Sequence, residues 1–160
     1  EARTATAAIG GREVTGRITV TDADLEAVYR AYRFVEGAKN VVVFSGPQLS
    51  LFEMQRLAER FAGRQVAPGM HCFATTNHAI HSDAARLGYL KTLEDAGVTV
   101  LQGVCFYILQ RLTEIRVENG WANLVSNSAK LVNTITAHRF NTVLRRTQDC
   151  VEIACTGRLQ

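Results

Sequence analysis

The sequence predicts a three-layer α/β domain with a mostly parallel sheet. Short apolar runs, such as NVVVF at residues 40–44, do not alternate with polar residues, a pattern typical of strands buried on both faces. Segments with helical periodicity separate these runs, and the connections between them are short. Alternation of this kind favours parallel strands joined by right-handed helical crossovers. We therefore expect one α/β domain over residues 1–160.

Residues 1–38 are expected to form a lead-in strand and helix. A short strand is predicted at residues 17–20, where β-branched residues gather. Thr21 is followed three residues later by Asp24, which approximates a capping box at the start of a helix. The apolar spacing that follows predicts a helix over residues 23–35.

Repeated strand–helix units are expected over residues 39–160. Leu51, Met54 and Leu57 illustrate the helical spacing, because they fall on one face of an expected helix. Pro47 and Pro68 are expected in turns. The predicted strands are residues 40–44, 71–74, 98–101, 122–125 and 142–144, and the predicted helices are residues 50–62, a segment ending near residue 96, and a last helix beginning near residue 147.

The composition is that of a soluble globular protein, with 47% hydrophobic and 21% charged residues. The net charge of +3 is too small, and the arginines too dispersed, to predict a nucleic-acid partner. No apolar run approaches the ~20 residues that a membrane-spanning helix needs, and the N-terminus does not resemble a signal peptide. We expect a cytoplasmic protein with neither a nucleic-acid nor a membrane partner.

The cysteines are expected to be free thiols. Cys72 lies in an apolar strand-like run, and Cys150 and Cys155 lie in a helix-like one, which favours burial over disulfide formation. Their spacings match no zinc module. Cys105 differs because it follows Gly103 at the end of an expected strand, where a thiolate can bind iron or act as a nucleophile. A structural cysteine is equally compatible with this position, and no base lies nearby in sequence to activate a nucleophile.

Ligands of open α/β sheets bind outside the carboxyl ends of the strands. The segments that leave the expected strands are rich in hydroxyl, amide and glycine groups, and helix N-termini next to them favour anions. The sequence therefore predicts a polar crevice at this edge. Its segments are residues 45–48, 75–78, 102–105 and 126–130, and its candidate substrate-binding residues are Ser45, Gln48, Thr75, Thr76 and Asn127.

The densest candidate is SNSAK at residues 126–130, a sequence suited to holding a carboxylate through Asn127, Ser128 and Lys130. Ordinary helix capping by Asn127 or Ser128, with Lys130 in solvent, explains the same residues equally well. His78 and His81 have no acidic or cysteine neighbours that would complete a metal site, so surface histidines are expected.

Several segments resemble the catalytic subunit of aconitase X. They are GVCFY at residues 103–107, NGW at 119–121 and SNSAKLVN at 126–133, supported by SGPQLSL at 45–51 and DCVEIA at 149–154. The resemblance covers the C-terminal part of that subunit and runs along the whole of this chain. It points most closely to the bacterial branch that dehydrates cis-3-hydroxy-L-proline.

This resemblance implies an aconitase-like fold and a hydro-lyase that acts on a small hydroxy acid. Such enzymes remove a proton beside a carboxylate and expel a β-hydroxyl group with the help of an iron–sulfur cluster. By the same resemblance Cys105 is a cluster ligand, Ser128 and Lys130 are catalytic, and Asn127 helps them hold the substrate carboxylate. The expected partner is the remainder of the enzyme, including its small swivelling subunit, which would supply the other cluster ligands.

Two alternatives remain open from the sequence. The chain could be a non-catalytic or cluster-free partner subunit that keeps the aconitase X scaffold. It could also be a cofactor-free enzyme that uses the crevice for another carboxylic acid. The number of cluster ligands separates these hypotheses from the first one, because one cysteine cannot hold a cluster alone.

Overall fold

The computed structural model describes residues 2–158, which form two compact units that divide between Ala31 and Tyr32. The first unit contains α1 (Ala5–Ile9) and α2 (Asp22–Ala31), neither of which buries a side chain. The second unit carries the α/β fold. That the whole of residues 1–160 is a single domain stays a prediction.

The start of α2 follows the sequence. The Thr21 amide donates to Asp24 Oδ2 at 2.8 Å, and the Asp24 amide donates to Thr21 Oγ1 at 3.3 Å, which confirms the predicted capping box. The hydrogen bond from the Thr21 hydroxyl lowers the pKa of Asp24 below its ordinary value. The strand predicted at residues 17–20 was wrong, because this segment has no regular structure. Ile18 is 92% exposed, and an extended segment without a neighbouring strand is not stable as a sheet.

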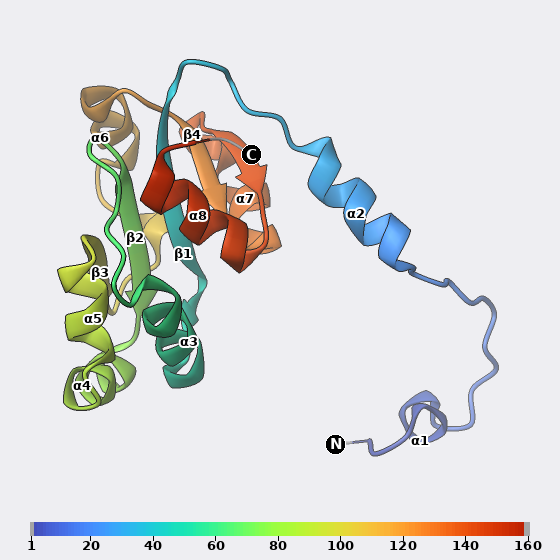
Figure 1. Ribbon diagram of the computed structural model, residues 1–160. Helices are drawn as coiled ribbons and strands as arrows, with labels where there is room; N and C mark the ends of the chain where they lie inside the picture. Colours follow the sequence, from blue (N-terminus) through green and yellow to red (C-terminus); the bar gives the residue numbers. More distant parts are fainter. Residues whose placement is uncertain (1, 159–160) are drawn as a thin grey trace. The chain divides into compact units, whose positions relative to one another are not determined.

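The second unit is built on a parallel sheet in the order β3-β2-β1-β4-β5 (Figure 1). Each of the five strands predicted from an apolar run in residues 39–160 is confirmed. Their observed bounds are β1 (Lys39–Leu49), β2 (His71–Thr76), β3 (Val98–Gln102), β4 (Trp121–Ser126) and β5 (Asn141–Leu144). The chain builds outward from β1 to β3, then returns to add β4 and β5 on the other side of β1. The topological switch point therefore lies between β1 and β4.

Helices cover both faces of the sheet, which confirms the three-layer prediction. Val42 and Phe44 of β1 pack into the core on one face, whereas Val41 and Val43 pack into the core on the other. The first core lies under α3 (Leu51–Phe61), α4 (His78–Arg86), α5 (Tyr89–Asp95) and α8 (Thr147–Thr156). The second lies under η1 (Phe106–Ile108), α6 (Leu112–Asn119), α7 (Ala129–Thr134) and η2 (Ile135–His138), where η marks a 3₁₀ helix.

The predicted helix ending near residue 96 is in fact two helices, α4 and α5. They separate at Gly88, whose φ of 81° lies in the left-handed region that a helix cannot include. The helix predicted over residues 23–35 also ends early, at Ala31. Residues beyond it are held by asparagine side chains of the sheet instead: Asn123 Oδ1 accepts from the Val35 amide, and Asn141 Nδ2 donates to the Arg33 carbonyl.

Pro47 was predicted in a turn but lies within β1, in a segment where the register shifts. Phe44 pairs with Ala74 and Leu49 pairs with Thr76, so β1 advances by five residues while β2 advances by two. The extra residues form a bulge at the carboxyl edge of the sheet. Pro68 lies in a turn as predicted. Within residues 2–158 no helix combines the length and the apolar character that crossing a membrane requires.

Candidate functional site

The bulge of β1 places Ser45 at the centre of a buried hydrogen-bond cluster. The Thr75 hydroxyl donates to Ser45 Oγ at 2.7 Å, and the Phe106 amide donates to the same oxygen at 3.3 Å. A hydroxyl group accepts two hydrogen bonds and donates one. Since both acceptor positions are occupied, the Ser45 hydrogen is left to point at Cys105 Sγ, which lies 3.7 Å from Ser45 Oγ.

Cys105 and Lys130 line one pocket of about 350 Å³. Cys105 is half-buried, immediately before η1, and Lys130 is exposed in the first turn of α7. The pocket opens beside the switch point between β1 and β4, where ligands of open α/β sheets bind. Its lining residues are Gly46, Cys105, Tyr107, Ile108, Lys130, Leu131 and Thr134. The structure thus brings Ser45, Thr75, Cys105 and Lys130 together.

Two glycines make this close packing possible. Gly46 in the bulge has φ of 70°, and a Cβ there would stand 3.2 Å from the Cβ of Leu131. Gly103, with φ of 71°, lies directly under the imidazole of His78, where a Cβ would come within 2.4 Å of Nε2. His78 therefore flanks the strand end that leads to Cys105, a proximity that its place in sequence did not reveal.

Ser128 links the β1 bulge to the start of α7. Its hydroxyl donates to the Gly46 carbonyl and accepts from the Leu131 amide at 3.1 Å, so it caps α7 and ties that helix to the β1 bulge. These two hydrogen bonds occupy the Ser128 hydroxyl, so the geometry indicates that Ser128 positions α7. A catalytic role for Ser128 stays a prediction.

We expect Ser128→Ala to lower the free energy of unfolding by about 1–2 kcal/mol, because it removes the cap of α7 and the tether to Gly46. Urea unfolding of the variant would measure the loss. Ser82→Ala is the matched control, since Ser82 is an exposed helical serine whose hydroxyl donates to a carbonyl of its own helix. Equal, small losses of unfolding free energy in the two variants would contradict this structural role of Ser128.

Thr76 and Gln48 contribute little to a pocket. The Thr76 hydroxyl is buried and donates to the Leu49 carbonyl at 2.7 Å, which closes the β1 bulge. Gln48 is half-buried on the bulge and lines neither of the pockets described here. Their assignment to substrate binding stays a prediction that these contacts do not support.

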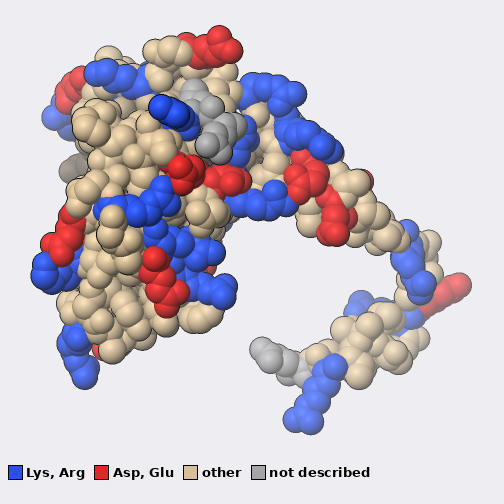
Figure 2. Space-filling view, viewed as in Figure 1, with Lys and Arg blue, Asp and Glu red and all other residues tan. Residues whose placement is uncertain are grey.

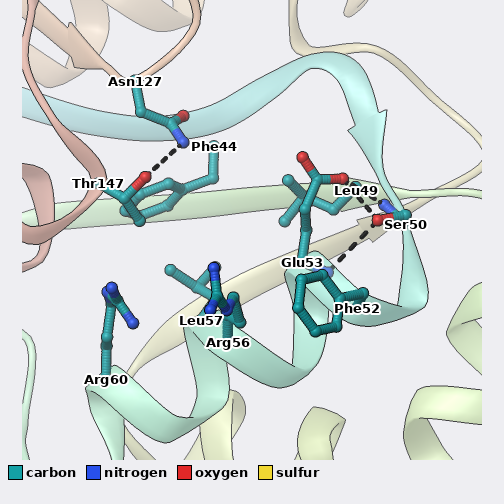
Figure 3. Close-up of a pocket in the computed structure, with 10 residues that line it drawn as sticks. All are labelled: Phe44, Leu49, Ser50, Phe52, Glu53, Arg56, Leu57, Arg60, Asn127 and Thr147. Atoms are coloured by element: carbon teal, nitrogen blue, oxygen red, sulfur yellow. Dashed lines mark hydrogen bonds between the residues drawn. The ribbon is translucent and has the colours of Figure 1, made fainter.

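Asn127 lines a different pocket from Lys130. Asn127 Nδ2 donates to Thr147 Oγ1 at 3.0 Å, and both residues line a pocket of about 540 Å³ beside α3 (Figure 3). This second pocket also contains Arg56 and Arg60, which sequence analysis did not single out. The loop after β4 therefore sends its side chains to opposite faces of the sheet, and the structure does not bring Asn127 together with Lys130.

The remaining cysteines lie away from the edge. Cys72 and Cys150 are buried in the core under α3 and α8, and Cys155 packs against that core, as predicted for free thiols. Burial raises the pKa of the Cys72 and Cys150 thiols well above the ordinary value. Cys105 is half-buried and lines the pocket, whereas Cys150 is buried, as its place in a helix-like run predicts.

These buried thiols predict a loss of stability at alkaline pH. Their pKa is higher in the folded than in the unfolded state, so the folded state holds their protons more tightly. The stabilisation is fully present below about pH 8.5 and is lost as the pH rises toward the folded pKa, by up to about 1.4 kcal/mol per pH unit for each thiol. Urea unfolding between about pH 7.5 and 9.5, a range centred on the unfolded pKa of roughly 8.5, measures how steeply the free energy of unfolding falls with pH. The Cys72→Ala variant should have a shallower slope; the same slope in both proteins would contradict the assignment.

The histidines have structural contacts. His71 Nδ1 lies 3.0 Å from Trp121 Nε1, which donates to it, and His138 contacts the Thr113 hydroxyl and the Tyr107 carbonyl, each at 3.0 Å. Within the described residues no three His, Cys, Asp or Glu side chains gather as a metal site. His78 is exposed and His81 is half-buried, and their lack of a metal-binding role stays a prediction.

Comparison with known proteins identifies the family. A family model described as the aconitase X third domain matches residues 39–156, which is most of the chain and nearly all of its α/β unit. The chain belongs to the aconitase X family. The predicted family membership is thus confirmed, and the matched part is the C-terminal α/β scaffold with the bulge, the Cys105 pocket and the loop after β4.

Two relatives of this aconitase X chain carry dehydratase names. It is 28% identical over 162 residues to the cis-3-hydroxy-L-proline dehydratase of Hypocrea jecorina, an alignment covering 98% of this chain and 26% of that protein. It is 38% identical over 56 residues to the 3-isopropylmalate dehydratase large subunit of Mycolicibacterium smegmatis, covering 34% of this chain and 13% of that subunit. The names of these relatives indicate a family of hydro-lyases. This chain spans only a part of each relative's length.

The fold is also that of a solved aconitase X. The holo-form of the Thermococcus kodakaraensis protein superimposes with a TM-score of 0.71 at 22% sequence identity, over 88% of this chain and 36% of that one. An aconitase-like α/β fold is therefore confirmed. At this identity the similarity establishes the fold and no residue role.

The described residues do not complete an iron–sulfur site. Such clusters are held mainly by several cysteine thiolates, and Cys105 is the one cysteine that residues 2–158 place beside the crevice. Cys72, Cys150 and Cys155 lie in or against the core on the α3 and α8 face. Residues 2–158 thus offer one cysteine ligand beside the crevice, and they do not fit a complete cluster.

Proposed function

We propose that this chain supplies the C-terminal α/β part of a hydro-lyase that dehydrates a small hydroxy acid such as cis-3-hydroxy-L-proline. The observation that carries the proposal is the pocket at the switch point, which Cys105 and Lys130 both line. The dehydratase names of both relatives support the reaction class. Because the chain spans 26% and 13% of those relatives, the proposed enzyme includes further segments.

In this proposal Lys130 binds the substrate carboxylate. Its side chain is exposed, and among the described residues no carboxylate forms an ion pair with it. An ammonium group beside an otherwise largely apolar pocket forms a charge-assisted hydrogen bond with a carboxylate oxygen. Ser45 and Thr75 shape the wall behind Cys105, and Ser128 holds α7 so that Lys130 faces the pocket.

Cys105 is proposed as the single ligand that this chain contributes to an iron–sulfur cluster. The Ser45 hydroxyl lies within hydrogen-bond reach of the Cys105 sulfur. Hydrogen bonds to the sulfurs of an iron–sulfur cluster shift its reduction potential. The other ligands would come from segments outside this chain. If instead the chain is a cluster-free partner subunit, Cys105 has no part in metal binding.

The test uses the assembled enzyme purified without air, with all of its chains. Cys105→Ser is expected to reduce bound iron and abolish dehydration of cis-3-hydroxy-L-proline. Cys155→Ser is the matched control, because Cys155 is also half-buried but packs against the core. Full iron content and activity in Cys105→Ser would overturn the ligand assignment. An assembled wild-type enzyme without iron or activity would favour the cluster-free subunit.

A further inference from the structure

The pocket of about 540 Å³ beside α3 lies across the sheet from the Cys105 pocket. Phe44 and Leu57 in its lining belong to the core under α3 and α8, whereas Leu131 of the Cys105 pocket belongs to the core on the opposite face. In Figure 3 its side chains come from β1, α3, the loop after β4 and the start of α8. It is therefore a separate site that the proposed dehydration does not use.

Two arginines point into this pocket from one face of α3. Arg56 and Arg60 are one helical turn apart, and Figure 3 shows both guanidinium groups directed toward Phe44 and Thr147. Among residues 2–158 no carboxylate forms an ion pair with either of them. The same surface is rich in basic side chains where α3 and α8 face the viewer in Figure 2, with acidic groups among them.

Arg60 has a donor without an acceptor. Its Nε is buried and lacks a hydrogen-bond partner in the described structure, which is a costly arrangement for a charged group. An oxyanion that binds a guanidinium through two parallel hydrogen bonds can engage Nε and a terminal nitrogen together. A ligand of this kind would satisfy this donor once the Arg60 side chain turns to bring the enclosed Nε to the pocket.

The one carboxylate in the lining does not neutralise these arginines. Glu53 accepts hydrogen bonds from the Ser50 amide at 2.9 Å and the Ser50 hydroxyl at 2.7 Å, so it is committed to the cap of α3. The Arg56 guanidinium instead lies 4.8 Å from the centre of the Phe52 ring. Both positive charges therefore remain available to a ligand.

The opposite wall adds polar groups of the right kind. Thr147 is the first residue of the ten-residue α8, so the positive end of that helix dipole lies beside the pocket. Asn127 donates to Thr147 Oγ1, and Figure 3 shows it beyond Thr147, on the side away from the two arginines. Apart from Ser50 and Glu53, the rest of the lining is apolar: Phe44, Leu49, Phe52 and Leu57.

From this arrangement we infer that the pocket binds a small oxyanion, a phosphate or carboxylate group attached to a short apolar body. Arg56 and Arg60 bind the anionic group from one side, and the start of α8 with Asn127 bounds it on the other. The apolar body lies against Phe44 and Leu57. This site is independent of Cys105 and Lys130.

Calorimetric titration of the protein with inorganic phosphate, and separately with propionate, tests the inference at low ionic strength. We expect saturable binding of at least one of these ions, weakened about tenfold or more by Arg56→Gln and by Arg60→Gln, since each removes hydrogen bonds between charged groups. Arg86→Gln is the matched control, because Arg86 is a highly exposed helical arginine outside the pocket. Arg60→Lys keeps the charge but lacks the Nε donor, and should bind with intermediate affinity.

The ion that binds more tightly in the wild-type protein identifies the anionic group of the ligand. Absence of saturable binding of both ions would overturn the inference. So would equal losses in Arg86→Gln and the two pocket variants, because that result indicates only a general effect of positive charge. Circular dichroism of each variant shows whether the protein is folded, so that a loss of binding is not caused by unfolding.

Discussion

Asn123→Ala is expected to lower the free energy of unfolding by about 3 kcal/mol or more, the largest effect among the stability predictions made here. Asn123 is fully buried, and its side chain makes four hydrogen bonds. Its Nδ2 donates to the Val35 carbonyl and Asn40 Oδ1, and its Oδ1 accepts from the Val35 amide and Asn141 Nδ2. Alanine leaves several of these buried groups without partners, at about 1–3 kcal/mol for each.

Thermal or urea unfolding measures this loss, and a fall in the melting temperature of about 10 °C is expected for a unit of this size. Asn133→Ala is the matched control, because Asn133 is an exposed asparagine of α7 and should change stability by less than about 0.5 kcal/mol. A loss in Asn123→Ala as small as that of the control would show that water replaces the four bonds.

The strands of this sheet could be predicted because their residues are buried on both faces. Val41, Val42 and Val43 are each wholly buried, which requires the continuous apolar run seen in the sequence. The same logic failed at residues 17–20, where Ile18 and Val20 are β-branched but exposed. Local propensity cannot supply the neighbouring strand that makes an extended segment part of a sheet.

The edge that carries the site could be predicted, whereas its internal arrangement could not. Parallel strands bring their carboxyl ends together, so Ser45, Thr75 and Cys105 were expected near one another. Their hydrogen bonds depend on the extra residues of β1 between Phe44 and Leu49, and nothing in the local sequence sets the length of that bulge. The sequence pattern also gives no sign that a chain turn directs consecutive residues to opposite faces of the sheet, as it does at Asn127 and Ser128.

The arginine pocket shows another limit of sequence analysis. Arg56 and Arg60 are ordinary in sequence, since exposed arginines on amphipathic helices are common. Their significance depends on Thr147, about ninety residues away along the chain, and on the absence of a carboxylate partner among the described residues. Only packing of α3 beside α8 creates that juxtaposition.

The largest effect on substrate binding is expected for Lys130→Ala in the assembled enzyme. Loss of one charge-assisted hydrogen bond to the substrate carboxylate should weaken binding by about 1.5–3 kcal/mol, which is roughly 10- to 150-fold in affinity. Stability should change by less than about 0.5 kcal/mol, because Lys130 is exposed and pairs with no carboxylate among the described residues. These two expectations separate a ligand-binding lysine from a structural one.

The measurement pairs a titration with cis-3-hydroxy-L-proline and a thermal unfolding experiment on the same variant. Lys91→Ala is the matched control, because Lys91 is also an exposed helical lysine but pairs with Asp95 at 2.6 Å and lies outside the Cys105 pocket. Binding should remain unchanged in that control. Unchanged binding in Lys130→Ala together with a large loss of stability would show that Lys130 is structural. The carboxylate would then have to be held by residues outside this pocket, because Lys130 is its one positively charged lining residue among those described.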